Sequence, residues 1–421
     1  MLFRIKGGQK RWCWGVAAIV ALTWSATAGA ALRPSYGGEL VIWSPSSPQS
    51  VEPAQAWSAI EVLLANALGG RVSAVLDGPP QVAGGVITLT LGNAAEWPDG
   101  SAIDAKGLAR LLRNALAEAP VSLPPFTFRS SGREITAVLA TPLLGEESYL
   151  ELPWFRLSRG ADGGAFRVKK DAYEADPAAI GGRPLVDRVR VEAKQGRHLE
   201  PPPDGIALAQ AGGENRPVFA LPRPKGPARP ALMAALATLN RESIAAHFVR
   251  APAHVPDGWP IPVAATVDVP DKPVVIAFDA ADRDLRTVAE RLQILLLDRQ
   301  ITARIAAEDR ATHFIRLAHG DYDLALVALP PAPHLVQAAT LLRLAFGTEA
   351  GQRFWSRSDV AGDQPDDAAI LERTATDVGA VLLYVEDGGV TLGTRVHAPV
   401  TPALWQLDLG DVWLAPASGA P

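Results

Sequence analysis

The sequence contains one cysteine in 421 residues, Cys13, which lies in an apolar stretch near the start of the chain. It does not stand at a cleavage site, so we do not expect it to carry a lipid. If the first thirty residues are removed on export, the remaining chain has no cysteine. It then cannot form a disulfide, a thiolate metal site or a cysteine nucleophile. Such a protein depends on its apolar core for stability, which suits a bacterial periplasm.

Sequence motifs of common enzyme classes are also missing. The chain has no H-E-x-x-H, G-x-S-x-G, P-loop or G-x-G-x-x-G motif. His313 and His319 are six residues apart and do not share a helix face well, so we interpret them as surface or core histidines. We therefore predict no enzyme activity, no cofactor and no metal site. A glycosidase-type carboxylate pair exists only in the fold, so a secreted hydrolase stays open as an alternative.

The beginning of the chain has the order of a secretory signal peptide. Four basic residues come first, an apolar stretch follows over residues 12–24, and small residues occupy positions 25–30. Cleavage after Ala28 or Ala30 fits this pattern. The alternative is a retained membrane anchor, for which the apolar stretch is short. We predict that residues 1–30 are a cleaved signal peptide and that the protein is exported to the periplasm.

The charge balance excludes two kinds of partner. The chain has 40 basic and 45 acidic residues, and residues 1–30 hold four of the basic ones and none of the acidic ones. The rest therefore has 36 basic against 45 acidic residues, a formal net charge of −9. An acidic surface argues against binding to nucleic acid or to anionic membranes. No later stretch is long and apolar enough to span a bilayer, so membrane contact is expected only through a partner protein.

Strand and helix patterns alternate along the chain, which predicts an α/β fold class. The clearest example is in the second half, where the order strand, helix, strand implies a parallel crossover unit. Its helix is predicted over residues 284–298, capped by Asp282 or Asp284. The pattern also predicts strands at 39–43, 86–91, 272–278, 301–305, 324–329 and 380–385, and helices after Asp104, at 231–248 and at 368–377.

Proline and turn residues mark the breaks between these elements. Residues 217–230 contain too much proline for regular structure, and we interpret them as a linker or a crossing between lobes. Residues 97–100, Trp-Pro-Asp-Gly, are interpreted as a turn that begins a helix rather than as a catalytic loop. Asp321 and Asp323 are likewise interpreted as structural.

Several segments, in this order, resemble the family of periplasmic oligopeptide, dipeptide and nickel binding proteins of ABC importers. Each match is short, but their order along the chain is that of the family. They are residues 37–42 with 51–53 (opening strand and "L-D-P" turn), 97–105 ("F-x-D-G-x-P-(V/L)-T-A-x-D-V"), 163–168 ("G-T-G-P-(F/Y)"), 183–189 ("(K/R)-P-x-L-D-x-(I/V)"), 229–232 with 240–244 ("R-x-A-(I/L)…D-R-x-x-I") and 320–326 ("G-x-(F/Y)-D-(L/M)").

The resemblance implies a two-lobed, type II periplasmic-binding-protein-like α/β fold with a hinged cleft between the lobes. Residues 31–226 and 388–421 would form lobe I, and residues 227–387 lobe II. The sequence departs from the family in shortened segments at 54–85 and 198–228. Gln300 also stands where the family commonly has a glycine before the isoleucine.

Candidate ligand-binding residues follow by analogy with this architecture. Aromatic side chains supply contact area at low entropic cost, and ligands of α/β folds bind at the carboxyl ends of strands. Trp43 and Ser44 end the opening strand, and Trp57 follows it. In the second lobe we select Leu329 and His334. Peptide-binding members commonly carry an aspartate here, but residues 330–334 contain none, which puts a peptide ligand in doubt.

The function that the resemblance implies is an extracytoplasmic solute-binding protein, a monomer that delivers a peptide or similar small solute to the permease of an ABC importer. The first alternative is a degenerate scaffold with a sensing or protein-partner role and no transport ligand. The second is the secreted hydrolase mentioned above.

Overall fold

Residues 34–416 of the computed structural model are described, apart from several gaps. The chain divides after Ser35, and Tyr36–Pro421 is one compact unit. The signal-peptide prediction for residues 1–30 lies outside the described residues. Among the described residues, no helix is both long and apolar enough to cross a lipid bilayer. The gaps are residues 46, 53–55, 84, 119–125, 140–153, 158–162, 171, 181, 195–199, 209–213, 250–252, 258, 260–268, 331–337, 340–341, 343–366 and 399–406.

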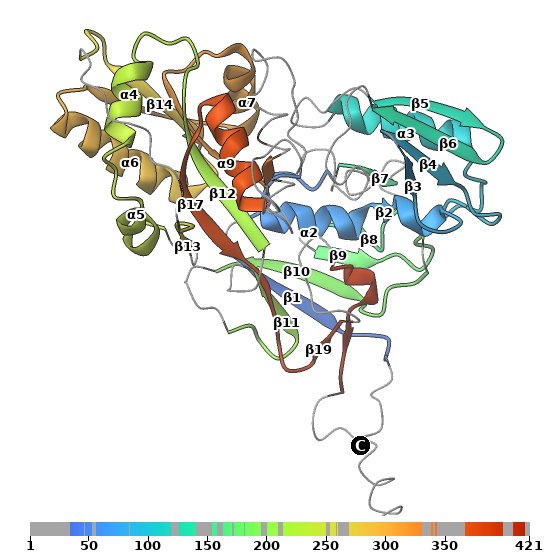
Figure 1. Cartoon of the computed structure of the whole chain (residues 1–421). Helices are drawn as coiled ribbons and strands as arrows, with labels where there is room; N and C mark the ends of the chain where they lie inside the picture. Colours follow the sequence, from blue (N-terminus) through green and yellow to red (C-terminus); the bar gives the residue numbers. More distant parts are fainter. Residues whose placement is uncertain are drawn as a thin grey trace, which may run out of the picture. The chain divides into compact units, whose positions relative to one another are not determined.

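The first six-stranded sheet has the order β18-β11-β1-β10-β9-β8, with the predicted opening strand inside it (Figure 1). β1 (Glu39–Ser44) is parallel to both neighbours, β10 (Arg188–Ala193) and β11 (Gly205–Leu208). Leu40 and Ile42 of β1 share one apolar core with α2 (Ala59–Leu68), which is buried along most of its length. The outer strands are β8 (Phe166–Lys169), β9 (Ala172–Ala175) and β18 (Val390–Leu392).

A four-stranded antiparallel sheet follows, in the order β3-β4-β6-β5, with α3 (Ala105–Glu118) packed on β5. The predicted turn precedes α3: the Gly100 N–H donates to the Trp97 carbonyl at 2.8 Å. Gly100 has a φ of +80°, which favours glycine. The Asp104 carboxylate accepts a hydrogen bond from the Gly107 N–H, so the predicted cap is confirmed. The strands are β3 (Gln81–Ala83), β4 (Val86–Thr90), β5 (Phe126–Ser131) and β6 (Glu134–Leu139).

The second six-stranded sheet has the order β13-β17-β12-β16-β14-β15 and contains the predicted parallel crossover. β14 (Val274–Asp279) pairs in parallel with β15 (Ala303–Glu308) and with β16 (Leu324–Ala328). α6 (Arg283–Asp298) connects β14 to β15 and is capped by Asp282, as predicted. α7 (Arg310–His319) connects β15 to β16. The remaining elements include β13 (Ala253–His254), β17 (Val381–Gly388), α4 (Arg229–Leu236), α5 (Arg241–His247) and α9 (Asp367–Val378).

Two predictions for the middle of the chain are wrong. Residues 217–222, predicted to be irregular, belong to β12 (Glu214–Pro222). The sheet tolerates Pro217 because it lies beside a bulge at Val218 and Phe219 and because its carbonyl still accepts the Leu329 N–H at 3.0 Å. The single helix predicted over 231–248 is two helices, α4 and α5, because the Asn240 side chain caps a new start by accepting from the Ser243 N–H.

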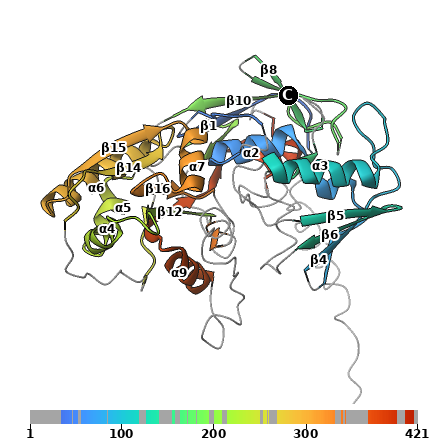
Figure 2. The ribbon, with the colours of Figure 1, turned by 90° about the horizontal axis from the view of Figure 1, so that it is seen from above.

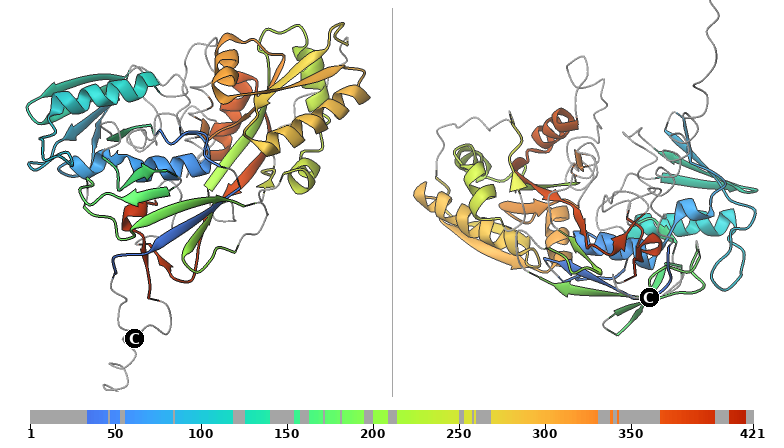
Figure 3. Two further views of the ribbon diagram at one scale, coloured as in Figure 1. Left: turned by 180° about the vertical axis from the view of Figure 1, so that it is seen from behind. Right: turned by 90° about the horizontal axis from the view of Figure 1, so that it is seen from below.

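Two connections join the six-stranded sheets. β11 leads to β12 through residues 209–213, and β17 leads to β18 through Gly389 alone. β12 and β17 run side by side in the second sheet (Figure 3). The predicted lobe I thus includes β12, which pairs with β16 and β17, so a boundary drawn by sheets lies at 209–213 rather than at 226. The division into lobes stays a prediction.

A buried ionic cluster ties β12, β17 and α6 together close to these connections. Arg216 donates to Glu386 at 2.8 Å and to Asp282 at 2.6 Å. Two carboxylates share one guanidinium here, so the cluster is short of positive charge. Burial and the neighbouring Asp282 raise the pKa of Glu386 to about 7, although Arg216 opposes the shift.

The loop after α6 contains a backbone conformation that sidechain-bearing residues rarely adopt. Gln300 has a φ of +64°. Its N–H donates to the Leu297 carbonyl, so the turn that ends the helix depends on this conformation. This is the position at which the resemblance implies a glycine, and the backbone conformation supplies the physical reason for that residue.

We expect Gln300→Gly to raise the free energy of unfolding by about 1 kcal/mol, because glycine adopts a positive φ without strain at its Cβ. Urea unfolding followed by circular dichroism measures the change. Arg299→Gly is the matched control: Arg299 has a φ of −100°, so glycine there should lower stability by about 0.5–1 kcal/mol. A similar loss in both variants would contradict the prediction.

The Glu386 cluster predicts a pH dependence. The unfolded pKa is near 4.5 and the folded pKa near 7, so the folded protein holds an extra proton between these values. Glu386 therefore lowers stability progressively as the pH rises through this window. The unsubstituted protein should therefore lose free energy of unfolding between pH 4.5 and pH 8, and Glu386→Gln should not. Over this range the difference in unfolding free energy should shift in favour of the variant by up to about 3 kcal/mol.

Unfolding free energies measured across that pH range test this expectation. Glu174→Gln is the control, because Glu174 pairs with Lys169 on the exposed surface. The control should leave the pH profile unchanged. A Glu386→Gln profile parallel to that of the unsubstituted protein would refute the assignment.

Candidate functional site

The carboxyl ends of β14 and β16 meet the start of α2, which follows β1, at the place where the two six-stranded sheets make contact. Figure 2 shows α7 beside α2. We call this place the inter-sheet junction. Its residues on the side of the first sheet are Trp57, Glu61 and Trp154, and those on the side of the second sheet are Asp279, Arg310, Phe314 and Ala328.

Glu61 is the central polar group of the junction. Its side chain is only 1 % exposed and accepts hydrogen bonds from four backbone N–H groups and one arginine. Oε1 accepts from Gln49 at 2.8 Å and from Ser50 at 3.4 Å. Oε2 accepts from Trp57 at 3.0 Å and from Ser58 at 2.9 Å. This carboxylate therefore fixes the segment that leads from β1 into α2.

The fifth donor of Glu61 comes from the other sheet. Arg310, the first residue of α7, donates Nη1 to Glu61 at 2.5 Å and Nε to Asp279 at 2.9 Å. Burial alone would raise the pKa of Glu61, but the charge of Arg310 and the backbone hydrogen bonds outweigh it, so this pKa lies below its usual value. Glu61 is thus ionised at neutral pH and bonded to a cation across the junction.

An aromatic cluster lies beside the ion pair. The Trp57 ring stacks on Trp154 with centroids 6.2 Å apart and meets Phe314 of α7 edge-on at 4.7 Å. The indole N–H of Trp57 donates to the Ala328 carbonyl at the end of β16, at 2.8 Å. Trp57 thus contacts the second sheet through its indole N–H, and its ring contacts Trp154 and α7.

The predicted site residues do not all come together. Trp57 lies in the junction, and Leu329 follows Ala328 there with a fully buried side chain. Ser44 is buried at the end of β1. Trp43 alternates onto the opposite face of β1, where its N–H donates to Glu192 at 3.1 Å and Lys194 lies 5.3 Å from the ring centroid. His334 lies outside the described residues, and ligand contact stays a prediction for all five.

Two residues of the junction, Glu61 and Arg310, are absent from the predicted site. The order Ser58-x-x-Glu61 is the signature of a capping box, and Glu61 accepts the Ser58 N–H at 2.9 Å, as the glutamate of such a box does. This signal could have identified Glu61 as a residue that is held at the start of a helix. Nothing in the sequence points to Arg310 as its partner, because the two residues are 249 positions apart.

The histidine interpretation agrees with the structure. His313 is buried on α7, where burial lowers its pKa to about 4, so it is neutral at neutral pH. His319 is exposed at the end of the same helix. Within the described ranges, no group of three or more histidine, cysteine or acidic residues could hold a metal ion.

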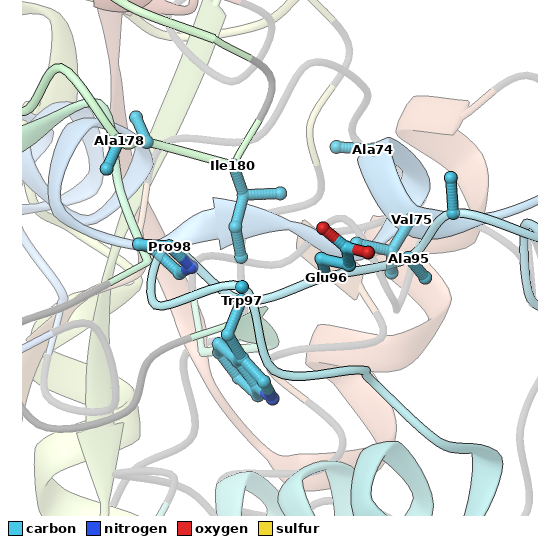
Figure 4. Close-up of a pocket in the computed structure, with 11 residues that line it drawn as sticks. Ala74, Val75, Ala95, Glu96, Trp97, Pro98, Ala178 and Ile180 are labelled. Carbon is cyan, nitrogen blue, oxygen red and sulfur yellow. The ribbon is translucent and has the colours of Figure 1, made fainter.

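A cavity of about 340 Å³ lies elsewhere, between the Trp97–Gly100 turn and residues 178–180 (Figure 4). Its lining is largely alanine, valine, isoleucine and proline, with Trp97 and the carboxylate of Glu96. Among the described residues, none of the predicted ligand-binding residues lines it. It is therefore a feature of the first half of the chain and separate from the inter-sheet junction.

Comparisons of sequence identify no relative: no protein-family model matches the chain, and no curated protein matches it. Comparisons of structure do. The oligopeptide-binding protein AppA from Bacillus subtilis, in complex with a nonapeptide, has a TM-score of 0.63 at 12% identity, over 91% of this chain and 100% of that chain. A substrate binding protein from Microbacterium hydrocarbonoxydans, complexed with 4-hydroxybenzoate hydrazide, has a TM-score of 0.62 at 13% identity, over 89% and 99%.

A third similar structure is NikA from Staphylococcus aureus in complex with Ni(L-His)2. Its TM-score is 0.60 at 12% identity, over 89% of this chain and 99% of that chain. At these identities the likeness defines the fold. The chain has the two-lobed α/β fold of type II periplasmic binding proteins.

Proposed function

We propose that this protein is an extracytoplasmic solute-binding protein that closes its two lobes on a small solute and delivers it to the permease of an ABC importer. The observation that carries the proposal is the junction itself. Two sheets joined by only two connections also meet at the carboxyl ends of their strands, through an ion pair and an aromatic cluster. Hinged α/β proteins bind their ligands at such a place.

The solute is a peptide or a similar small molecule. This rests on the fold-level likeness to proteins whose complexes contain a nonapeptide, Ni(L-His)2 and a hydroxybenzoate hydrazide. The absence of an aspartate in residues 330–334 favours a solute that needs no carboxylate partner from that segment. The aromatic cluster at Trp57 favours a ligand with apolar surface.

The same proposal covers the setting of the protein. The basic, apolar and small-residue order at the start of the chain supports cleavage and export to the periplasm. The protein acts as a monomer without a cofactor and contacts the membrane through the permease. Its role is selective and reversible binding rather than catalysis.

We expect the purified protein to carry or to accept a small solute. Native mass spectrometry of freshly purified protein should show a bound mass that is lost on partial unfolding and dialysis. The emptied protein, mixed with the peptides of a tryptic casein digest or with a set of amino acids and nickel–histidine, should melt at least about 4 °C higher with one of them. No bound mass and no shift with any of these mixtures would contradict the proposal.

The affinity for the solute that gives the shift should then differ between two tryptophan variants. Trp57→Phe should weaken the affinity five- to tenfold, because phenylalanine lacks the N–H that bonds Ala328 across the junction. Trp413→Phe is the matched control, a buried tryptophan in the β19–β20 ladder (Val396–His397 and Trp413–Leu414). Isothermal titration measures both, and equal effects would exclude a role for Trp57 in closure.

A further inference from the structure

We propose that Glu61 and Arg310 form an interlobe latch, an ion pair that is broken when the lobes open and made when they close. This inference rests on the proposed function, because it assigns the residues that set the balance between open and closed forms. It concerns residues that lie outside the predicted ligand-binding set.

The first lobe carries a carboxylate that is already positioned to bind a cation. Four backbone N–H groups, from Gln49, Ser50, Trp57 and Ser58, hold both oxygens of Glu61. All four belong to the same lobe as Glu61, so they hold the carboxylate in place whether or not Arg310 is present. Hydrogen bonds of this kind keep a carboxylate ionised even where it is shielded from water. The open first lobe would therefore present a fixed negative charge.

The second lobe carries the matching cation, also held in advance. Arg310 begins α7, which Asp309 caps by accepting the Thr312 N–H at 3.0 Å. Asp279, at the end of β14, receives the Arg310 Nε and also accepts the Ala281 N–H at 3.0 Å. The guanidinium is thus oriented from its own lobe, with Nη1 directed to Glu61. Neither partner needs the other in order to be positioned.

The choice of charges at this contact is informative in itself. A buried ion pair is a weak source of stability, because both ions must lose their water, and an apolar pair often does better. The aromatic contact between Trp57 and Phe314 beside it opposes opening, because separation exposes apolar surface to water. Two charges regain water when they separate, so the ion pair adds a defined closed position and opposes opening less than further apolar contact would.

The Arg216 cluster shows the difference. Arg216, Asp282 and Glu386 all belong to the second sheet and its helix α6, so lobe movement would leave their contacts unchanged. Glu61 and Arg310 belong to elements associated with different sheets. Trp57 follows the same division, since it donates its backbone N–H to Glu61 and its indole N–H to Ala328. Its ring therefore reports whether the two lobes are in contact.

Fluorine NMR of protein labelled with 5-fluorotryptophan tests the latch without any ligand. Trp57→Phe assigns the Trp57 resonance. In Arg310→Gln we expect this resonance to move towards the solvent-exposed position, or to split, with at least a tenfold rise in the open population. Small-angle X-ray scattering of the same samples should give a larger radius of gyration.

Controls separate the latch from general damage to the fold. Arg316→Gln removes an arginine from the same helix whose partner, Glu308, lies in the second sheet, and it should leave the Trp57 resonance in place. Glu61→Gln should behave like Arg310→Gln, and the double variant should add little to either single one. If Glu61→Gln does not fold, Asp279→Asn provides the second test. It removes the carboxylate charge that orients the Arg310 guanidinium towards Glu61.

The outcomes for the latch and for the proposed function are distinct. An Arg310→Gln protein whose Trp57 resonance and radius of gyration match those of the unsubstituted protein overturns the latch, even if the unsubstituted protein binds casein peptides. A shifted resonance in a protein that binds none of the solutes tested leaves the latch standing and removes the transport role. Melting at a lower temperature with an unmoved resonance identifies a static contact and also overturns the latch.

Discussion

The structure depends above all on how one buried carboxylate is satisfied. Glu61 lies almost without solvent contact, and an ionised group in that position is tolerated only with enough donors around it. Its four backbone donors order the entry into α2, and α2 in turn shares an apolar core with β1. The fifth donor belongs to the second sheet. One side chain thus links the local chain geometry, the apolar core around α2 and the contact between the two halves.

The balance between burial and favourable contacts differs between the junction ion pair and the Arg216 cluster. At the junction, backbone dipoles supplement the arginine, and the pKa of Glu61 falls. In the Arg216 cluster, two carboxylates share one arginine, and burial raises the pKa of Glu386. Both groups contain two acids and one arginine. The charge of Arg310 and the backbone N–H donors together outweigh burial at Glu61, whereas Arg216 does not outweigh burial and the neighbouring acids at Glu386.

Much of the architecture could be predicted from the sequence, because it follows from local patterns. The period of the apolar residues identified α6, and Asp282 identified its start. The proline content wrongly predicted irregular structure at 217–222, because a bulge beside Pro217 lets the strand tolerate a residue without an N–H. The apolar pattern predicted one continuous helix, but Asn240 caps a new helix within it. At the site, aromatic type and position after β1 identified Trp57. The pairing of Glu61 with Arg310 could not be predicted, since it depends on how two distant helices approach each other.

The two connections between the sheets have unequal lengths, five residues on one side and the single residue Gly389 on the other. A tether of one residue allows very little separation of its ends, whereas five residues span up to about 17 Å when extended. Leu208 pairs with Val390 and Glu214 pairs with Gly388, so the two connections begin and end side by side. The one-residue connection keeps the end of β17 and the start of β18 together, and glycine, without a side chain to restrict its torsion angles, suits the change from one sheet to the other there.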